Sequence, residues 1–319
     1  LSSLSVDFFP PKISLEKLKV VKDDQQTLAL NELTVGIRAW PLFTKHIYLT
    51  DADIDGLILD VQQQKDRWII AGIDLTQYQQ PTEQDTPEEE ATEDDSTPWS
   101  VSVPSFRFTK STVHLARQLD DQSSPLKDTL TINQLAINDL SGAGLDWQGK
   151  LQLNALLNSA QFRISSEVEY TPNSANSSLL LGKNILPIED FAHFLPAPYA
   201  QSKGTVSLNG KFILSLLTND QLSSFSLSQS DLKVSADNLK LALQEKMSAR
   251  SKNTQLALSD LSITYNTDSA ITASGKLTLS SQDSAFSQDQ NQAAYQDLAI
   301  ESAFALKRQQ TSNNIKSQQ

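Results

Sequence analysis

The feature that most constrains this chain is an alternation of apolar and polar residues with a period of two. Between Ile271 and Leu279, for example, every second residue is apolar or glycine. This period places one face of a strand against apolar surroundings and the other face in water. Apolar residues at helical spacing are scarce, so we expect a mainly β fold. The same alternation recurs at Leu28/Leu30, Leu57/Leu59/Val61, Leu151/Leu153, Val206/Leu208 and Leu239/Leu241/Leu243.

A short phrase repeats within this alternation: two polar residues, leucine, any residue and an aliphatic residue. In three copies an aliphatic pair precedes the phrase, so the apolar positions change parity across the two polar residues. A change of parity predicts a bulge or a tight bend. The copies are residues 31–35, 133–137, 237–241, 259–263 and 296–300, with a looser copy at 16–20.

A second phrase joins glycine and lysine to an apolar residue and, two positions later, a leucine. It occurs at 149–153, 210–214 and 275–279, where we interpret each Gly-Lys pair as the start of a strand. Residues 129–155 and 255–281 contain both phrases. They predict one strand–bend–strand unit that is used twice.

These patterns predict an elongated, curved antiparallel β-sheet with one or two short helices. The sheet would be either a β-groove, shaped like a taco, or an open barrel-like meander. The best helix candidate is 187–195, with Pro187 in its first turn and apolar residues on one face. A shorter helical turn is expected at 40–43.

An acidic segment at 81–98 interrupts the alternation. It contains eight acids and no base, and without it the net charge of −12 would be −4. Its prolines and self-repulsion predict a disordered loop. We therefore expect an N-terminal β region at 1–80, repeated β units at 99–306, a disordered tail at 307–319 and an unstructured stretch at 281–291. An acidic docking segment is the alternative interpretation of 81–98.

Composition narrows the function. The acidic chain, with a pI of about 4.7, disfavours nucleic acid. The absence of cysteine excludes disulfides, cysteine-bound metals and thiol nucleophiles. No apolar run approaches the roughly 18 residues of a membrane span. The chain begins with leucine and has no signal peptide, so we expect it to be a piece of a longer protein.

The sequence resembles the AsmA-like branch of the AsmA/TamB envelope proteins. Its most specific stretch is 12–74, where Leu28–Ile37 is followed by Pro41-Leu42-Phe43 and then by Asp66–Ile70. Residues 188–196 and 204–210 are similar to the family's short helix and the strand after it. The likeness covers about 12–280, although the acidic segment interrupts the pattern.

The resemblance implies a periplasmic protein anchored in the inner membrane of a Gram-negative cell by an N-terminal helix that this sequence lacks. It implies repeating β-groove architecture, phospholipid movement, outer-membrane biogenesis and no catalytic residues or cofactor. Alternating apolar residues would then line a lipid groove, although a sealed core has the same pattern. The groove candidates are Leu57, Leu59, Leu151, Leu153, Leu239, Leu241, Leu277 and Leu279.

Other chemistry is weakly indicated. Asp51, Asp53 and Asp55 resemble the opening of a calcium loop, but Gln62 stands where the bidentate glutamate belongs, which favours a polar strand edge. The three histidines lack metal-ligand spacing. The Gly-Lys pairs lack the rest of a phosphate loop, and no Gly-x-Ser-x-Gly elbow is present. The four tryptophans could line a groove, but core anchors at sheet ends are the commoner use. They are Trp40, Trp68, Trp99 and Trp147.

Two functions follow. The first is passive binding or conduction of phospholipid by an apolar β-groove. The alternative is a non-enzymatic structural or regulatory scaffold that contacts outer-membrane assembly factors through strand edges or the acidic segment. A hydrolase ranks third.

Overall fold

The computed structural model describes residues 1–22, 24–65, 67–78, 98–118, 125–219, 221–244, 247–266 and 270–309. The chain divides into two compact units, Leu1–Asn158 and Ser159–Gln319. Both are built from strands, which confirms a mainly β fold. The predicted disorder of 81–98 and 307–319 lies almost entirely outside the described residues.

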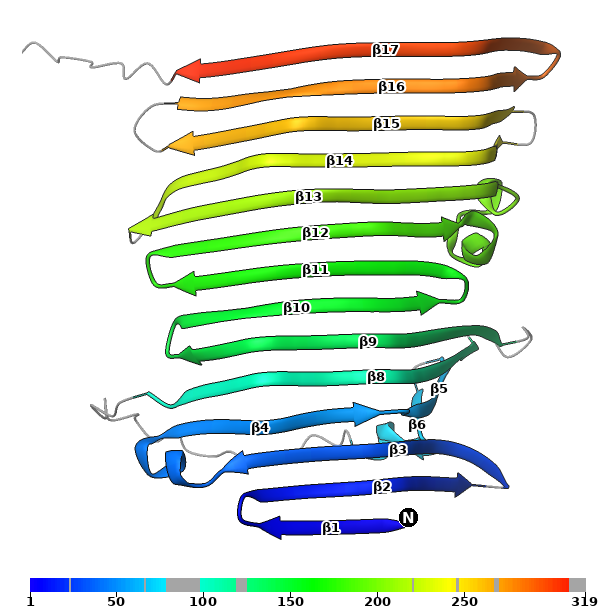
Figure 1. Ribbon diagram of the computed structural model, residues 1–319. Coiled ribbons are helices and arrows are strands. Elements are labelled where there is room, and N and C mark those ends of the chain that lie inside the picture. The colour runs from blue at the N-terminus through cyan, green and yellow to red at the C-terminus, as the bar shows by residue number, and fades with distance from the viewer. Residues whose placement is uncertain are drawn as a thin grey trace, which may run out of the picture. The chain divides into compact units, whose positions relative to one another are not determined.

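The first unit is a β-sheet in which most neighbouring strands run antiparallel (Figure 1). Pairing follows the chain from β1 to β4 and from β8 to β10, and β6 and β7 extend from β5. The strands are β1 (Ser3–Phe8), β2 (Pro11–Lys22), β3 (Gln25–Arg38), β4 (His46–Asp55), β5 (Ile58–Gln64), β6 (Arg67–Ile70), β7 (Ile73–Asp74), β8 (Ser100–Gln118), β9 (Leu126–Ala143) and β10 (Asp146–Leu157).

Two pairings depart from the expected antiparallel meander, because β8 runs parallel to both β4 and β5. A parallel pair needs a crossover connection of about a dozen residues or more. The stretch between Tyr78 and Pro98, which includes the acidic segment, is long enough to provide it. Strands on either side of that segment belong to the same compact unit.

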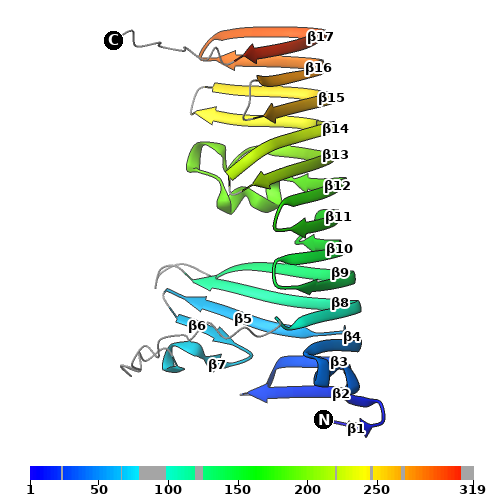
Figure 2. The ribbon, with the colours of Figure 1, turned by 90° about the vertical axis from the view of Figure 1, so that its left-hand side faces the viewer.

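The second unit is an uninterrupted antiparallel meander, in which each strand pairs with the next from β11 to β17 (Figure 2). The meander predicted from the alternation is confirmed here. The strands are β11 (Ala160–Thr171), β12 (Ser174–Pro187), β13 (Lys203–Asn219), β14 (Gln221–Gln244), β15 (Met247–Asn266), β16 (Ala270–Gln288) and β17 (Asn291–Gln309).

Both predicted helical segments form 3-10 helices, η1 (Trp40–Thr44) and η3 (Ile188–Phe194). Two further 3-10 helices, η2 (Leu75–Tyr78) and η4 (Ala197–Tyr199), were not expected. Pro41 and Pro187 stand at or just before the first turns of η1 and η3, where a missing N–H leaves no helical hydrogen bond unmade. None of the helices that the structure describes is long and apolar enough to cross a membrane.

The unstructured stretch predicted at 281–291 is wrong, because β16 continues to Gln288 and β17 begins at Asn291. Likewise, Lys307–Gln309 belong to β17 rather than to a tail. Phe286 is the one large apolar side chain in these stretches, so their pattern does not indicate strands. Apart from the turn at 289–290, they are held by pairing between β16 and β17.

Neither unit has a thick core. Among the described residues, the buried apolar side chains are mostly alanines, and the largest is Leu30. Serines and other small polar residues are buried as often. The units are therefore stabilised mainly by backbone pairing and by apolar side chains that stay half-exposed.

Candidate functional site

Many apolar residues of the second unit line up on one face of its sheet, from β13 to β17. Directly opposed residues of neighbouring strands share a face, so the strand registers trace rows of side chains across the sheet. One row runs Leu208–Val234–Leu256–Leu279–Ile300, and the next runs Gly210–Leu232–Leu258–Leu277–Ser302. The result is a continuous apolar surface from β13 to β17, which we call the apolar face.

The first unit has an apolar face of the same kind. Its longest row crosses seven strands, and neighbouring members are directly opposed at every step. The parallel pairing of β4 with β8 keeps the row intact, because Ile54 lies opposite Phe108. The row is Leu4, Leu15, Leu33, Ile54, Phe108, Leu135 and Leu153.

Large side chains on these faces keep much of their surface in contact with solvent. In the second unit, Leu256 is 41% exposed, Ile300 is 49% and Phe304 is 40%. In an ordinary sealed core such residues would be nearly fully buried. No second layer of described residues covers them, so these faces are open apolar surface.

The eight leucines proposed as groove residues all remain partly exposed. Leu151 and Leu153 lie opposite Ile137 and Leu135 on the apolar face of the first unit. Leu59 lies opposite Leu28 and Val113, while Leu57 falls in the break between β4 and β5. In the second unit, Leu277 and Leu279 lie opposite Leu258 and Leu256, and Leu239 and Leu241 lie opposite Ser251 and Ala249.

A corner crosses the strands of the second unit where β14 to β17 change the parity of their apolar positions. Ser251 and Thr254 are three residues apart on β15, so in a regular strand they would point to opposite faces. Instead, both donate or accept hydrogen bonds in one cluster with Ser281 and Ser284 of β16. The two residues between the members of each pair must therefore point to the other face.

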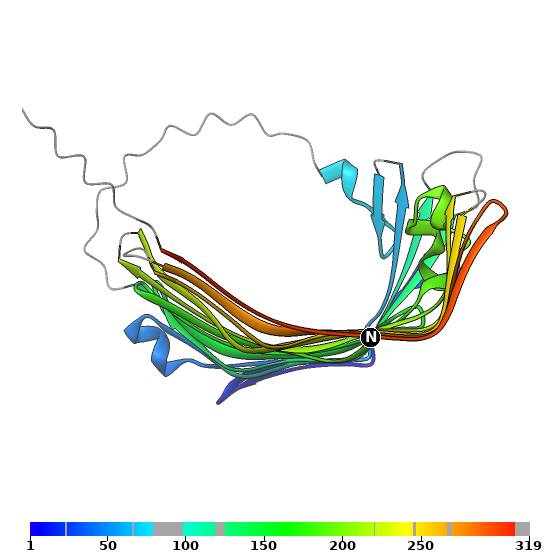
Figure 3. The ribbon, with the colours of Figure 1, turned by 90° about the horizontal axis from the view of Figure 1, so that it is seen from above.

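The outward pairs at this corner include copies of the repeated polar phrase. Asp237–Asn238 lies on β14 and Gln296–Asp297 on β17, and Asn238 has a left-handed φ of 51°. The equivalent pair on β16 contains Asp283, with a φ of 47°. Figure 3 shows the orange and red strands turning along their length. The bend predicted from the parity change is confirmed at this corner.

Bulges elsewhere confirm other copies of the phrase. Lys17 and Asp260 have positive φ, and the register shifts between Ser259 and Ser262. A further shift lies beside Asn133, where Gln134 pairs with Asn154 but Ile132 pairs with Ala155. Each shift lets apolar residues on both sides of the polar pair stay on one face.

Fully buried serines stabilise two of the bulges. Ser230 follows Gln229, which has a φ of 46°; its hydroxyl donates to the Ser228 carbonyl at 3.0 Å and accepts the Ile213 N–H of the neighbouring strand at 3.3 Å. Ser111 makes the same two contacts, with Thr109 and Leu57. These residues were missed by the sequence analysis, although a polar residue followed by serine within an alternating run is a signal that could have found them.

The Gly-Lys pairs lie inside strands, so their interpretation as strand starts is wrong. Two of the three lysines instead meet an aspartate of the preceding paired strand. Lys150 contacts Asp139 and Lys276 contacts Asp260, each at 3.2 Å, and both aspartates have left-handed φ. A Cβ at Gly275 would come within 2.9 Å of the Phe304 ring, so glycine lets this ring pack over the strand. The strand–bend–strand unit predicted at 129–155 and 255–281 is thus confirmed as two similar hairpins.

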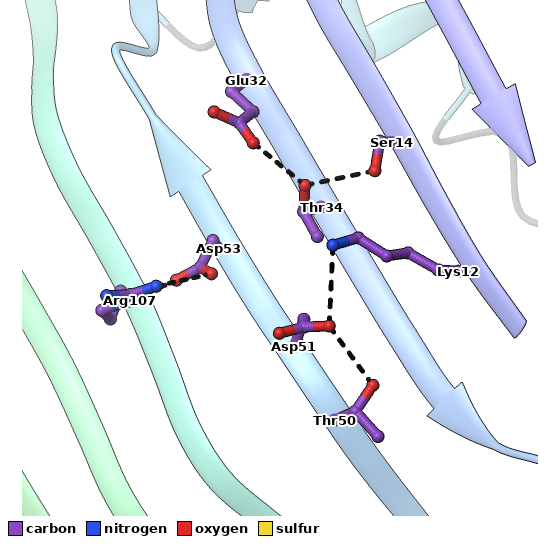
Figure 4. Close-up of polar contacts among 8 residues, drawn as sticks. All are labelled: Lys12, Ser14, Glu32, Thr34, Thr50, Asp51, Asp53 and Arg107. Atoms are coloured by element: carbon purple, nitrogen blue, oxygen red, sulfur yellow. Dashed lines mark hydrogen bonds and ion pairs between the residues drawn. The ribbon is translucent and has the colours of Figure 1, made fainter. Parts of the chain in front are cut away.

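The face opposite the apolar rows is polar. In the first unit it carries Asp51, Asp53 and Asp55, which alternate along β4. Figure 4 shows Asp51 and Asp53 with their partners. Arg107 donates two hydrogen bonds to Asp53, at 2.6 and 2.9 Å, and Lys12 lies 3.7 Å from Asp51. This contact with Asp53 raises the pKa of Arg107.

Asp55 has partners of its own: Thr109 donates to it at 2.8 Å and Lys110 lies 3.3 Å away. The Thr109 hydroxyl is the main cause that lowers the pKa of Asp55 from its ordinary value of 3.8. The three aspartates therefore do not converge on one point as calcium ligands would. No group of three or more metal-ligating side chains is found in the part of the chain that the structure describes.

A shallow pocket of about 460 Å³ crosses β14 to β17 at the corner. It takes three consecutive residues from each strand, and Leu239 is the only groove candidate among them. Lys240, Arg250 and Lys252 contribute positive charge, and Lys252 is paired with Asp283.

Histidines and tryptophans form no common site. The histidines lie on β4, β8 and η3, and His46 shares a 2.6 Å hydrogen bond with Ser100. The expectation that the tryptophans are core anchors is wrong, because all four are at least 40% exposed and Trp40 is 84% exposed. Trp147 instead donates to the Gly144 carbonyl within a hairpin turn.

Comparison with known proteins gives no relative for this chain: no family model, no curated protein and no solved structure matches it.

Proposed function

We propose that this chain binds the acyl chains of phospholipids on its apolar faces, as the periplasmic part of an inner-membrane-anchored protein that supports outer-membrane biogenesis. The mechanism is passive and needs no catalytic group or cofactor. An acyl chain lies along the apolar rows while its head group stays in water. Each buried methylene contributes about 0.8 kcal/mol to binding.

One observation carries this proposal: the opposed rows of large apolar side chains are continuous across strands and remain half-exposed. Contiguous apolar surface of this kind on a folded protein is typical of interaction sites. Each row is linear and takes one residue, often a leucine, from each successive strand. A linear apolar surface suits a long flexible chain better than a compact ligand.

The test is capture of dioleoylphosphatidylglycerol and dioleoylphosphatidylethanolamine, followed by native mass spectrometry. Leu279→Asp places a charge on the apolar face and should lower capture several-fold. Ser280→Asp is the matched control, because it places the same charge one residue along β16 on the polar face, opposite Gln255 and Ala299.

Equal capture by both variants, or no capture by the unmodified protein, would contradict the proposal. The latter result would favour the competing scaffold function, in which contact with outer-membrane assembly factors replaces lipid binding. Cell fractionation of the natural protein would test the proposed periplasmic location independently of lipid binding.

A further inference from the structure

The last strand of the second unit, β17, offers one edge for pairing. Its inner edge is in register with β16 along its length, from Asn291 opposite Gln288 to Gln309 opposite Ala270. Among the described residues, β17 pairs with β16 alone. A long exposed edge of this kind presents a row of backbone donors and acceptors to another chain.

Large apolar side chains lie along this edge, so its exposure to water is unfavourable. Ile300 and Phe304 lie on the apolar face, and Leu306, on the same face of β17, is 61% exposed. Natural edge strands are usually shortened, bulged or charged on the inside to prevent pairing. Over Asp297–Lys307, β17 has none of these protections and runs in unbroken register with β16.

We propose that this edge binds a second copy of the chain, with the two β17 strands antiparallel about a two-fold axis at Ser302. Under this symmetry each pairing occurs twice. Ile300 then lies opposite Phe304 of the second copy, and Leu298 lies opposite Leu306. On the polar face, Asp297 lies opposite Lys307 and forms an ion pair.

Neighbouring registers lack this complementarity. Centring the axis on Glu301 places two carboxylates directly opposite each other, which is unfavourable. Centring it on Ile300 leaves Asp297 and Lys307 both opposite alanines. Centring it on Phe304 places Arg308 opposite Ile300. The Ser302 register alone among these matches apolar with apolar residues and acid with base.

The corner limits how far the pairing extends. Beyond Asp297 the strand turns at Gln296–Asp297, so a straight second strand can follow it only from Asp297 to Lys307. Because the axis is perpendicular to the sheet, the apolar faces of the two copies lie on the same side. The inference therefore does not depend on lipid binding, although the dimer would extend the apolar surface.

The absence of cysteine makes the register directly testable. Directly opposed residues of antiparallel strands have Cα atoms about 4.5 to 5.5 Å apart, which a disulfide can span. Ser302→Cys should therefore oxidise to a covalent dimer. Asn209→Cys, an exposed position on the interior strand β13, is the matched control and should remain monomeric. Ala299→Cys and Ala305→Cys should cross-link to each other when mixed, but neither with itself.

Analytical ultracentrifugation of charge variants tests the ion pair separately. Asp297→Lys or Lys307→Asp alone should weaken dimerisation at least about tenfold, and the double variant should restore it. Both single variants keep the edge itself, so a change in mass reports the interface. A monomeric unmodified protein at about 100 μM, cross-linking of Asn209→Cys as fast as Ser302→Cys, or failure of the double variant to restore association would overturn the proposal.

Discussion

Arg117 donates a 2.6 Å hydrogen bond to Asp128, a carboxylate that is only 3% exposed, near the end of the β8–β9 pair. Asn158 donates to the second carboxylate oxygen at 2.9 Å, and its own side-chain oxygen accepts the Thr129 N–H. The charge of Asp128 is thus held by two donors from β8 and from the turn after β10. In a unit with so small an apolar core, this polar cluster fixes where three segments meet.

Replacing Arg117 with methionine should destabilise the first unit by about 3 kcal/mol, because it leaves a buried carboxylate without its cation. Urea unfolding measures the loss. Lys110→Met is the control: this lysine also contacts an aspartate, but its side chain is 77% exposed, so its loss should cost less than about 1 kcal/mol. Equal losses would show that the burial of Asp128 does not matter.

Removing the hydroxyl of Ser230 should destabilise the second unit by about 1 to 3 kcal/mol, since the Ile213 N–H loses its acceptor inside the bulge. Ser230→Ala measured by thermal unfolding tests this expectation. Ser274→Ala on the exposed polar side of β16 provides the reference. The prediction fails if both variants melt at the same temperature.

The left-handed conformation of Asn238 makes a distinct prediction about the corner. Asn238→Ala should lower stability by about 1 kcal/mol, because a Cβ without a compensating polar group disfavours positive φ. Asn238→Gly should be tolerated, as glycine adopts this conformation freely. Chemical unfolding of both variants measures the difference. If loss of the asparagine side chain mattered instead of backbone strain, the alanine and glycine variants would lose the same stability.

The pKa of Asp55 predicts a pH dependence with a definite sign. Because folding lowers this pKa, the ionised form stabilises the folded state at neutral pH, and the contribution is lost as pH falls through the lowered pKa. Thr109→Val removes the main cause of the shift. It should reduce stability by less than about 1 kcal/mol at pH 7, and the difference should close as the pH falls through the lowered pKa of Asp55. A difference that persists in acid would assign the effect to packing.

Local patterns predicted the strands, the apolar faces and most of the bends. Side-chain direction in a strand depends only on parity, so the face shared by Leu277 and Leu279 can be read from the sequence. The polar pair at Asp237–Asn238 marked its corner for the same reason: apolar residues on both sides can share a face only if the backbone turns between them.

Contacts between distant segments could not be predicted in this way. The parallel placement of β8 beside β4 depends on a crossover whose path no local pattern specifies. Residues 281–288 become strand in part because Ser281 and Ser284 bond to Ser251 and Thr254 of the neighbouring strand. Similarly, alternation alone assigns the groove leucines to a face but does not say whether another layer covers it.

The shared corner restricts how a chain of this kind can change its length during evolution. Inserting one residue into β15 on either side of Lys252–Asn253 would move the rest of that strand out of step with both neighbours and reverse its faces. A tolerated insertion must therefore occur in every strand that crosses the corner, or in none. Duplication of a whole hairpin meets this condition, because both new strands already contain the corner at the same position. Such a sheet can therefore lengthen by the addition of complete hairpins.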